Sequence, residues 1–202
     1  MKVMIGYPPL PSAKGVPLLS QNRQFQWFNR PTYVYPMVPA YAATLAKRAG
    51  HDVVWADGVA EEWTPGQFEK QYLAASPEVL LVEAKTPVIK RYWETVARLK
   101  AIHPKGRIAL CGDHVTALPE ESMSQCPADF AITGGDYDFV FLDLLAALSG
   151  KAAMPAGVFY REDGAVRHTG RFELTRDLND LPLLDRDLTR WKLYSRENGN
   201  LK

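Results

Sequence analysis

Short apolar runs alternate with longer amphipathic stretches along the first 150 residues. Five runs rich in Val, Ile, Leu and Ala have the length of buried strands: residues 3–7, 52–56, 79–84, 107–111 and 130–133. Between them, apolar residues recur three or four positions apart, which is typical of a helix that packs one face on a core. The alternation predicts an α/β fold with a doubly wound, mostly parallel, five-stranded sheet.

Helix boundaries are indicated by capping residues. Residues 36–49 carry prolines in their first turn and are followed by Gly50, so we expect one helix there. Thr64-Pro65-Gly66-Gln67 has the layout of a capping box and predicts a helix to about residue 75. Thr86, followed by a proline, is the expected N-cap of the next helix. Two more helices are expected, from residue 119 and over residues 138–148.

The pattern changes beyond residue 150. Residues 158–160 and 166–168 flank Asp163-Gly164, which predicts a β-hairpin. A polar connector with a proline follows at residues 177–185, and residues 191–202 predict no element of their own. We therefore divide the chain into a ligand-binding domain, residues 1–150, and a hairpin with a linker, residues 151–202.

Composition narrows the function classes. The net charge of +1 argues against the large basic surface of a nucleic-acid-binding protein, so no nucleic-acid partner is expected. The sequence has no apolar run of about 18 residues and no signal-peptide pattern, so we expect no transmembrane segment and a cytoplasmic location. Cys111 and Cys126 are too few to bind an iron–sulfur cluster, and we expect no metal ligands in this chain.

Ligands of such sheets bind at the carboxyl ends of the strands, so the loops there are the candidate sites. The first strand ends in Gly6-Tyr7-Pro8-Pro9. Two prolines remove the N–H donors that a dinucleotide-binding turn offers to a pyrophosphate, which argues against NAD and FAD.

The loops after the fourth and fifth strands are small and polar. Gly112-Asp113-His114-Val115-Thr116 lets a ligand approach the backbone, and Thr133-Gly134-Gly135-Asp136 frees the backbone before a helix. The aspartates disfavour phosphate and can accept hydrogen bonds from amides. A plain turn between strand and helix explains the same residues without a ligand.

The segment between residues 8 and 35 predicts no regular element and is rich in aromatic side chains. Two interpretations remain open. The aromatic residues either cover a large flat ligand, or they cover the protein's own core or a partner domain.

The order of these motifs resembles the N-terminal cobalamin (B12)-binding domain of the B12-binding radical SAM enzymes. The resemblance is carried by the Tyr-Pro-Pro turn, the residue 35–43 helix start, the residue 49–53 junction, the residue 112–116 loop, the glycines after the fifth strand and the residue 180–185 connector. It implies a Rossmann-like, flavodoxin-like sheet that binds cobalamin, with the nucleotide tail in the sheet crevice. By position, the implied cofactor contacts are Tyr7, Pro8, Pro9, Lys85, Thr86, Gly112, Asp113, His114, Thr116, Thr133, Gly134, Gly135 and Asp136.

The resemblance also implies what this chain lacks. The Cys-x-x-x-Cys-x-x-Cys motif is absent, so the [4Fe–4S] cluster and SAM are expected only on a radical SAM barrel, joined in cis or acting in trans. The chain alone should not cleave SAM. It also lacks the Asp-x-His-x-x-Gly motif with which other corrinoid proteins ligate cobalt, so no protein imidazole is expected on the metal.

Two other classes of function stay open at this point. A flavodoxin-like FMN or nucleotide-binding domain would give a yellow protein, and the missing Ser/Thr-rich phosphate loop argues against it. A non-catalytic interaction domain would keep the fold and bind no cofactor.

Overall fold

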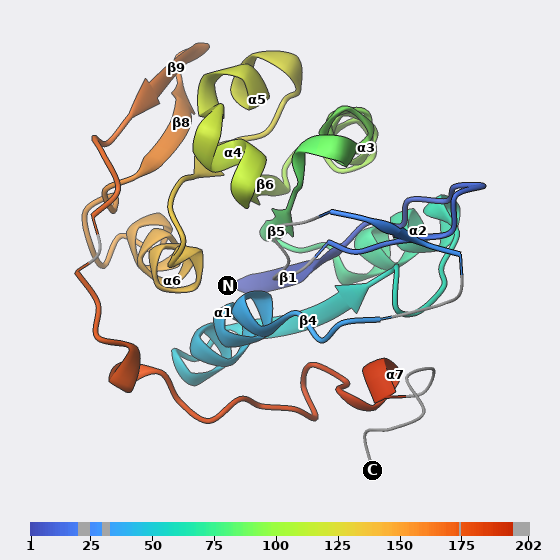
Figure 1. The fold of residues 1–202 in the computed structure, drawn as a ribbon. Helices are drawn as coiled ribbons and strands as arrows, with labels where there is room; N and C mark the ends of the chain where they lie inside the picture. Colours follow the sequence, from blue (N-terminus) through green and yellow to red (C-terminus); the bar gives the residue numbers. More distant parts are fainter. Residues whose placement is uncertain (20–24, 30–32, 174, 196–202) are drawn as a thin grey trace.

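The computed structural model describes residues 1–19, 25–29, 33–173 and 175–195, and Figure 1 shows their arrangement. A seven-stranded sheet runs through the molecule in the order β4-β1-β5-β6-β7-β8-β9. The first five strands in this order are parallel, and the last two are antiparallel. Their bounds are β1 Lys2–Tyr7, β4 Asp52–Asp57, β5 Val79–Glu83, β6 Arg107–Cys111, β7 Phe130–Ile132, β8 Val158–Glu162 and β9 Ala165–His168.

The predicted doubly wound, mostly parallel α/β sheet is therefore confirmed, but it has seven strands in place of the predicted five because the hairpin strands β8 and β9 join it. Because the chain leaves β1 toward β4 on one side and reaches β5 on the other, the strand order reverses at β1. This reversal is the topological switch point, where ligands of open α/β sheets bind.

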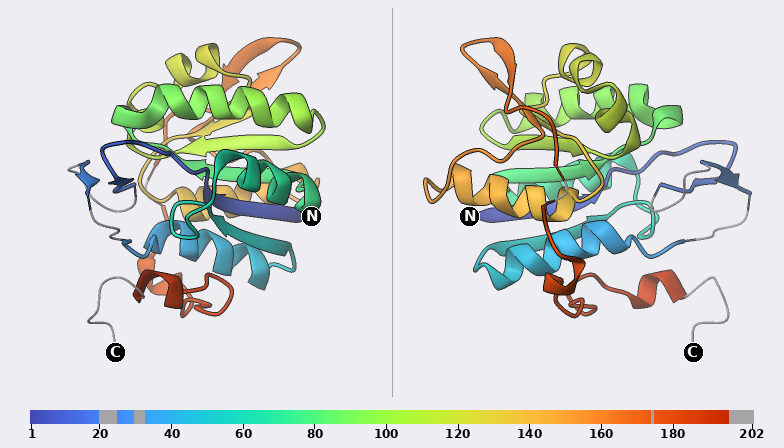
Figure 2. Two further views of the ribbon diagram at one scale, coloured as in Figure 1. Left: turned by 90° about the vertical axis from the view of Figure 1, so that its right-hand side faces the viewer. Right: turned by 60° about the vertical axis from the view of Figure 1, so that its left-hand side comes forward.

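Helices cover both faces of the sheet (Figure 2). Alternate strand residues face opposite sides: Met4 joins the core beneath α2 and α3, while Val3 and Ile5 join the core beneath α1 and α6. The helices are α1 Met37–Arg48, α2 Pro65–Ala75, α3 Ile89–Ile102, α4 Asp113–Ala117, α5 Pro119–Gln125, α6 Tyr137–Leu148 and α7 Lys192–Ser195, with 3₁₀ turns η1 Thr86–Val88 and η2 Leu178–Asp180.

The predicted capping box of α2 is confirmed. Thr64 Oγ1 accepts a hydrogen bond from the Gln67 backbone N–H at 3.3 Å, and Gln67 Oε1 accepts one from the Thr64 N–H at 2.8 Å. Pro65 stands at the first helical position, where its missing N–H removes no helical hydrogen bond.

The predicted hairpin forms, and it belongs to the same sheet. β8 pairs antiparallel with β7, and the turn at Asp163 and Gly164 has φ angles of 50° and 79°. The Arg161 guanidinium donates hydrogen bonds to the carbonyls of Ala128 and Cys126 at 2.9 and 2.8 Å, and also to that of Met123. This side chain ties the hairpin to the end of α5.

Several segments hold more structure than the sequence predicted. Residues 113–117, which were expected to belong to a loop, form the short helix α4, so His114 and Thr116 lie on a helix. In the loop between β1 and α1, β2 Val16–Pro17 pairs with β3 Trp27–Phe28, while residues 20–24 and 30–32 lie outside the described part. Near the carboxyl end, α7 forms where no element was expected, because its Tyr194 is buried against the sheet. Among the residues described, no helix is long and apolar enough to cross a membrane.

Candidate functional site

Parallel pairing gathers the candidate residues at one edge of the sheet. Tyr7 ends β1, Lys85 and Thr86 follow β5, residues 112–116 follow β6, and residues 133–136 follow β7. In the strand register, Tyr7 lies beside Asp57 and Glu83 lies beside Cys111. The structure therefore brings together the residues that the sequence assigned to one site.

Gly112 shapes the loop after β6. Its φ and ψ angles of 104° and −175° lie in a region that only glycine occupies readily. A Cβ atom here would stand 2.5 Å from the carbonyl oxygen of Ala84. Glycine thus allows the ends of β5 and β6 to lie side by side.

One hydrogen bond joins the two polar loops. The Gly134 backbone N–H donates to Thr116 Oγ1 at 3.1 Å. Thr133 is bonded to the segment before β8, because both its N–H and its hydroxyl donate to the carbonyl of Gly157, at 2.9 and 2.7 Å. Gly135 is exposed, and no heavy atom lies within 4 Å of the position of an added Cβ. Its backbone is therefore accessible from outside.

A buried chain of polar groups lies under this edge. Lys85, only 5 % exposed, has its Nζ 2.6 Å from Asp113 Oδ2 and 3.9 Å from Glu83 Oε1. The Tyr7 hydroxyl donates a hydrogen bond to Glu83 Oε2. Burial raises the pKa of the Glu83 carboxyl, while the Tyr7 hydrogen bond and the Lys85 charge act in the opposite direction.

Glu83 is a residue that the sequence analysis missed. The available signal was a charged residue at the end of the apolar run 79–84. Tyr137, at the start of α6, was missed as well; its buried hydroxyl contributes to the electrostatic environment of Glu83 but has no hydrogen-bond partner of good geometry among the described residues. The sequence gives no comparable signal for it.

His114 is buried, not exposed on its loop. Its Nδ1 is hydrogen-bonded to Thr86 Oγ1 at 3.2 Å, and its ring meets Trp93 edge to face at 5.7 Å. Its Nε2 lies 3.2 Å from a Glu121 carboxylate oxygen, without hydrogen-bond geometry. Both ring nitrogens therefore face groups of the protein.

The predicted role of Thr86 as an N-cap is wrong. The cap position before the 3₁₀ turn η1 is Lys85, which makes no side-chain capping bond. The Thr86 hydroxyl pairs instead with His114, a partner 28 positions further along the chain.

Pro8 and Pro9 are buried under the same edge. The Pro8 carbonyl accepts a hydrogen bond from the Tyr92 hydroxyl at 3.3 Å, and the Pro9 ring packs against Gly58. Both proline rings are buried, so the Tyr-Pro-Pro turn packs beneath the loops of the site and supports them.

A hollow of about 570 Å³ opens beside the polar loops. Thr116, Thr133 and Gly134 form one side of it. The other residues come from beyond residue 150 or from α5, and the sequence analysis did not include them: Pro119, Phe159, His168, Gly170, Arg171 and Phe172. Their approach depends on the pairing of β8 with β7, which no local pattern reveals.

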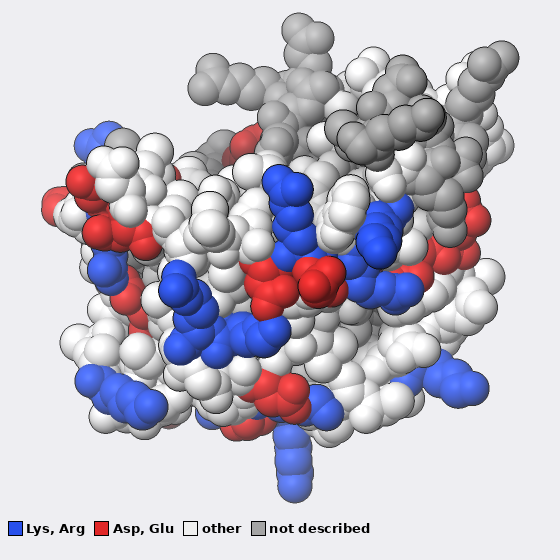
Figure 3. All heavy atoms as spheres, turned by 90° about the horizontal axis from the view of Figure 1, so that it is seen from below, with Lys and Arg blue, Asp and Glu red and all other residues white. Residues whose placement is uncertain are grey.

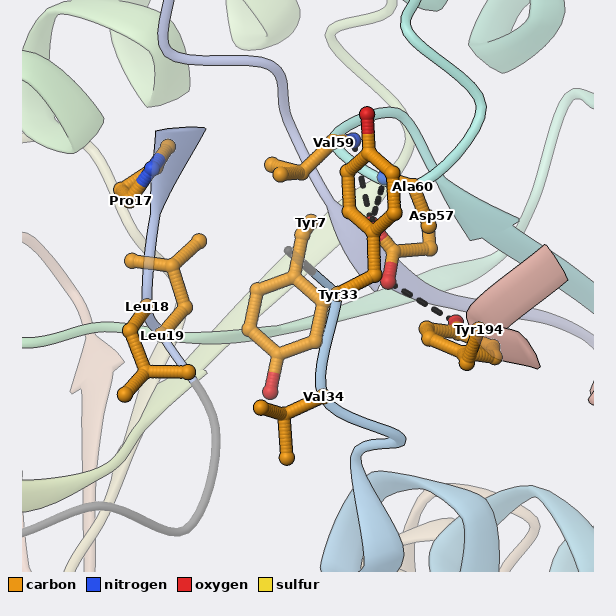
Figure 4. Close-up of a pocket in the computed structure, with 10 residues that line it drawn as sticks. All are labelled: Tyr7, Pro17, Leu18, Leu19, Tyr33, Val34, Asp57, Val59, Ala60 and Tyr194. Carbon is orange, nitrogen blue, oxygen red and sulfur yellow. Dashed lines mark hydrogen bonds between the residues drawn. The ribbon is translucent and has the colours of Figure 1, made fainter. Parts of the chain in front are cut away.

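A second, narrower pocket lies on the β4 side (Figure 4). Tyr7, Leu19, Tyr33, Asp57 and Tyr194 are among its lining residues. Tyr33 is buried there, and Phe25 and Trp27 pack against the core. These aromatic residues support the interpretation that the long loop covers the protein's own core.

Comparison with known proteins finds sequence relatives that are much longer than this chain. No protein-family profile matches the chain. An uncharacterized methyltransferase, PH0819 of Pyrococcus horikoshii, is 29% identical over 155 residues, which cover 76% of this chain and 34% of that protein. The anaerobic magnesium-protoporphyrin IX monomethyl ester cyclase of Rubrivivax gelatinosus is 26% identical over 114 residues, 56% of this chain and 20% of the cyclase. The chain thus spans about a third or less of the length of these relatives.

Solved structures share the fold. OxsB, a cobalamin-dependent S-adenosylmethionine radical enzyme solved with aqua-cobalamin and S-adenosylmethionine, matches with a TM-score of 0.71 and 15% identity, over 96% of this chain and 25% of OxsB. TsrM of Kitasatospora setae, a radical S-adenosylmethionine methyltransferase solved with cobalamin and a [4Fe–4S] cluster, matches with a TM-score of 0.62 and 13% identity, over 90% of this chain and 31% of TsrM.

Within the described part of the chain, no group of three or more His, Cys, Asp or Glu side chains is placed to hold a metal ion. The site consists of backbone, hydroxyl, carboxylate and ammonium groups beside an apolar hollow. The resemblance seen in the sequence is confirmed by two radical S-adenosylmethionine enzymes, OxsB and TsrM, which share this fold over most of the chain and were solved with cobalamin.

Proposed function

We propose that this chain is the cobalamin-binding module of a B12-dependent radical SAM enzyme of the methyltransferase or cyclase type. The observation that carries the proposal is the accessible polar edge at β6 and β7, on the fold of enzymes solved with cobalamin. The [4Fe–4S] cluster and SAM belong to a radical SAM barrel, joined to this domain or acting as a separate subunit.

An open backbone and a neighbouring hollow favour a large cofactor at this edge. The exposed backbone of Gly135 leaves room for a large ring system to approach. The 570 Å³ hollow between Thr116 and Phe159 is of the size and mixed character of small-molecule sites, and it suits the nucleotide tail.

The chemistry of the donors fits as well. A corrin ring carries amide side chains, which need hydrogen-bond donors and acceptors. Asp113, Thr116 and Asp136 supply acceptors, and the backbone N–H of the exposed Gly135 supplies a donor. Cobalamin, when bound, supplies methyl transfer or radical chemistry; this chain binds and orients it.

We do not assign the imidazole of His114 to cobalt. His114 is the nearest candidate by position, but both of its ring nitrogens face Thr86 and Glu121 inside the protein. A ligand role would require the ring to leave its packing against Trp93.

Corrinoid retention tests the proposal. The purified chain is reconstituted without oxygen with hydroxocobalamin, desalted and examined by absorbance. We expect near-stoichiometric corrinoid with a base-off spectrum that His114→Ala leaves unchanged. Gly135→Val should lower retention at least about tenfold, because the side chain fills the open approach. Gly66→Val is the matched control, since Gly66 at the start of α2 is equally exposed and open.

Three results would contradict the proposal. Folded wild type without colour means that the chain does not bind B12 unaided. Retention of FMN in place of corrinoid would favour a flavodoxin-like domain. Equal retention by Gly135→Val and Gly66→Val would move the site away from this edge.

A further inference from the structure

The segment that follows β9 returns across the molecule to the far edge of the sheet. It passes α1 and reaches the end of β4 (Figure 1). Residues 185–195 form a clasp there. Asp185 Oδ2 lies 2.5 Å from Lys47 Nζ, and the Asp185 N–H donates to Thr44 Oγ1 at 3.1 Å, so α1 anchors one end of the clasp.

Charged residues around the clasp are of both signs. Figure 3 shows the molecule from the side on which the clasp lies, with Lys and Arg side chains standing next to Asp and Glu. Arg190 is paired with Glu61, on the loop after β4. Such exposed pairs contribute little, so the clasp must be held chiefly by its buried contacts.

Tyr194 is the main buried contact. Its side chain is 2 % exposed, and its hydroxyl donates to Asp57 Oδ2 at 2.8 Å while accepting from Trp55 Nε1 at 3.2 Å. Both partners lie at the end of β4. The other oxygen of Asp57 accepts from the backbone N–H groups of Val59 and Ala60, each at 3.0 Å.

The clasp also contacts the loop that follows β1. The Tyr35 hydroxyl is hydrogen-bonded to Thr189 Oγ1 at 2.5 Å, and its ring meets that of Tyr194 edge to face at 5.2 Å. Two residues earlier, Tyr33 lines the narrow pocket together with Tyr7 and Tyr194 (Figure 4). Tyr7 is at the same time a residue of the candidate cofactor site.

We propose that Tyr194 is a positioning residue: through Asp57 and Tyr35 it holds residues 33–35 against the end of β4, and so keeps the β1 side of the cofactor site in place. This inference rests on the proposed function for its last clause. The contacts of Tyr194 described above lie at β4 and at Tyr35, so it acts on the cofactor site through residues 33–35 and through Tyr7.

The expected effect follows from the two hydrogen bonds. Tyr194→Phe keeps the ring contact with Tyr35 but leaves Asp57 Oδ2 and Trp55 Nε1 buried without this partner. Leaving buried polar groups unpaired favours local opening by roughly tenfold to a hundredfold. Amide hydrogen exchange measures such opening directly.

Hydrogen exchange with mass spectrometry tests the coupling without any ligand. In Tyr194→Phe, we expect faster exchange in residues 186–194 and also in residues 33–35, by at least about tenfold, with residues 79–83 of β5 unchanged. The NMR signal of the Trp55 indole N–H should shift and broaden. Tyr160→Phe is the matched control, because it removes a hydroxyl from β8 at the opposite side of the sheet.

A second variant separates the contact to the loop from the contact to β4. Thr189→Val keeps the shape of the buried side chain and removes the hydroxyl that bonds Tyr35. We expect faster exchange at residues 33–35 with the Trp55 signal unchanged. If Tyr194→Phe opens the clasp while residues 33–35 exchange as in wild type, the positioning role is refuted.

The cofactor measurement distinguishes this inference from the proposed function. If wild type retains hydroxocobalamin, Tyr194→Phe should release it several times faster than Tyr160→Phe. Equal release rates for Tyr194→Phe and Tyr160→Phe would refute the link between Tyr194 and the cofactor site, even if residues 33–35 exchange faster in Tyr194→Phe. If wild type retains none, the proposed function fails, and the exchange data still decide whether Tyr194 holds the loop.

Discussion

Asp57 offers the sharpest test of the electrostatics, because it is a carboxyl group buried at the end of β4. Burial raises its pKa from 3.8 to about 6, against the hydrogen bonds from the Ala60 N–H, the Tyr194 hydroxyl and the Val59 N–H. The perturbation is Asp57→Asn, studied from pH 4 to pH 7. The amide keeps an acceptor for the two backbone N–H groups and cannot ionise.

The sign and the magnitude follow from linkage. A carboxyl group with a raised pKa in the folded state contributes stability that is fully present below pH 3.8 and is lost as the pH rises through about 6. Each pH unit between these values corresponds to about 1.4 kcal/mol. Because the carboxyl group is already partly ionised in the unfolded state at pH 4, wild type should lose about 2.4 kcal/mol relative to Asp57→Asn between pH 4 and pH 7.

Urea unfolding at several pH values measures this difference. Asp138, whose pKa burial also raises to about 6, and Glu83 titrate in both proteins, so the comparison removes their contributions. The groups that interact with Asp57 are Glu61 on its own loop, Tyr7 on β1, Tyr92 on α3 and Tyr194 on α7.

Only Glu61 among these neighbours is a carboxyl group, and a Glu61→Gln background is the control for it. A difference between wild type and Asp57→Asn that stays constant within about 0.5 kcal/mol from pH 4 to pH 7 would refute the reasoning. It would mean that water reaches the carboxyl group in the folded protein.

Two further substitutions test the packing around the site. Gly112→Ala should destabilise the protein by about 3 kcal/mol in urea unfolding, because Gly112 has a φ of 104° and an added Cβ would stand 2.5 Å from the Ala84 carbonyl oxygen. Gly150→Ala is the control, and it should cost about 1 kcal/mol because open space surrounds Gly150. Similar costs for the two substitutions would contradict the argument from the close approach to Ala84. Arg161→Lys should cost about 2 kcal/mol, because the guanidinium contacts the carbonyls of Ala128, Met123 and Cys126 from two separate nitrogens and a compact ammonium reaches fewer of them. Arg167→Lys, in the exposed pair with Glu162, should change stability by less than about 0.5 kcal/mol. Equal effects of the two substitutions would contradict the role of Arg161 as the hairpin anchor.

The sheet could be predicted from the sequence because its signals are local. Apolar runs mark each parallel strand to within one residue, as in the match of residues 107–111 to β6. The capping box at Thr64 fixes the start of α2 for the same reason. Which loops meet at one edge then follows from the parallel topology alone.

The contacts inside the site could not be predicted, because they join distant positions. Lys85 pairs with Asp113, and Thr86 leaves its expected capping role for His114, each across 28 positions. The hydrogen bond of the clasp joins positions that are even further apart in the sequence, since Tyr194 and Asp57 are separated by 137 positions. Such pairs depend on how the faces of strands and helices pack, and no periodicity in the chain encodes it.

The charges at the edge bear on which cofactor fits. Lys85, the buried cation there, is already paired with Asp113, and Asp136 adds a negative charge near the glycine turn. A ligand with a phosphate monoester, such as FMN, would bring a dianion into this acidic setting, which Coulomb repulsion disfavours. Cobalamin carries neutral amides on its ring and one phosphodiester charge in its tail. Arg171 lines the hollow proposed for that tail, so the positive charge stands where a phosphodiester would need it.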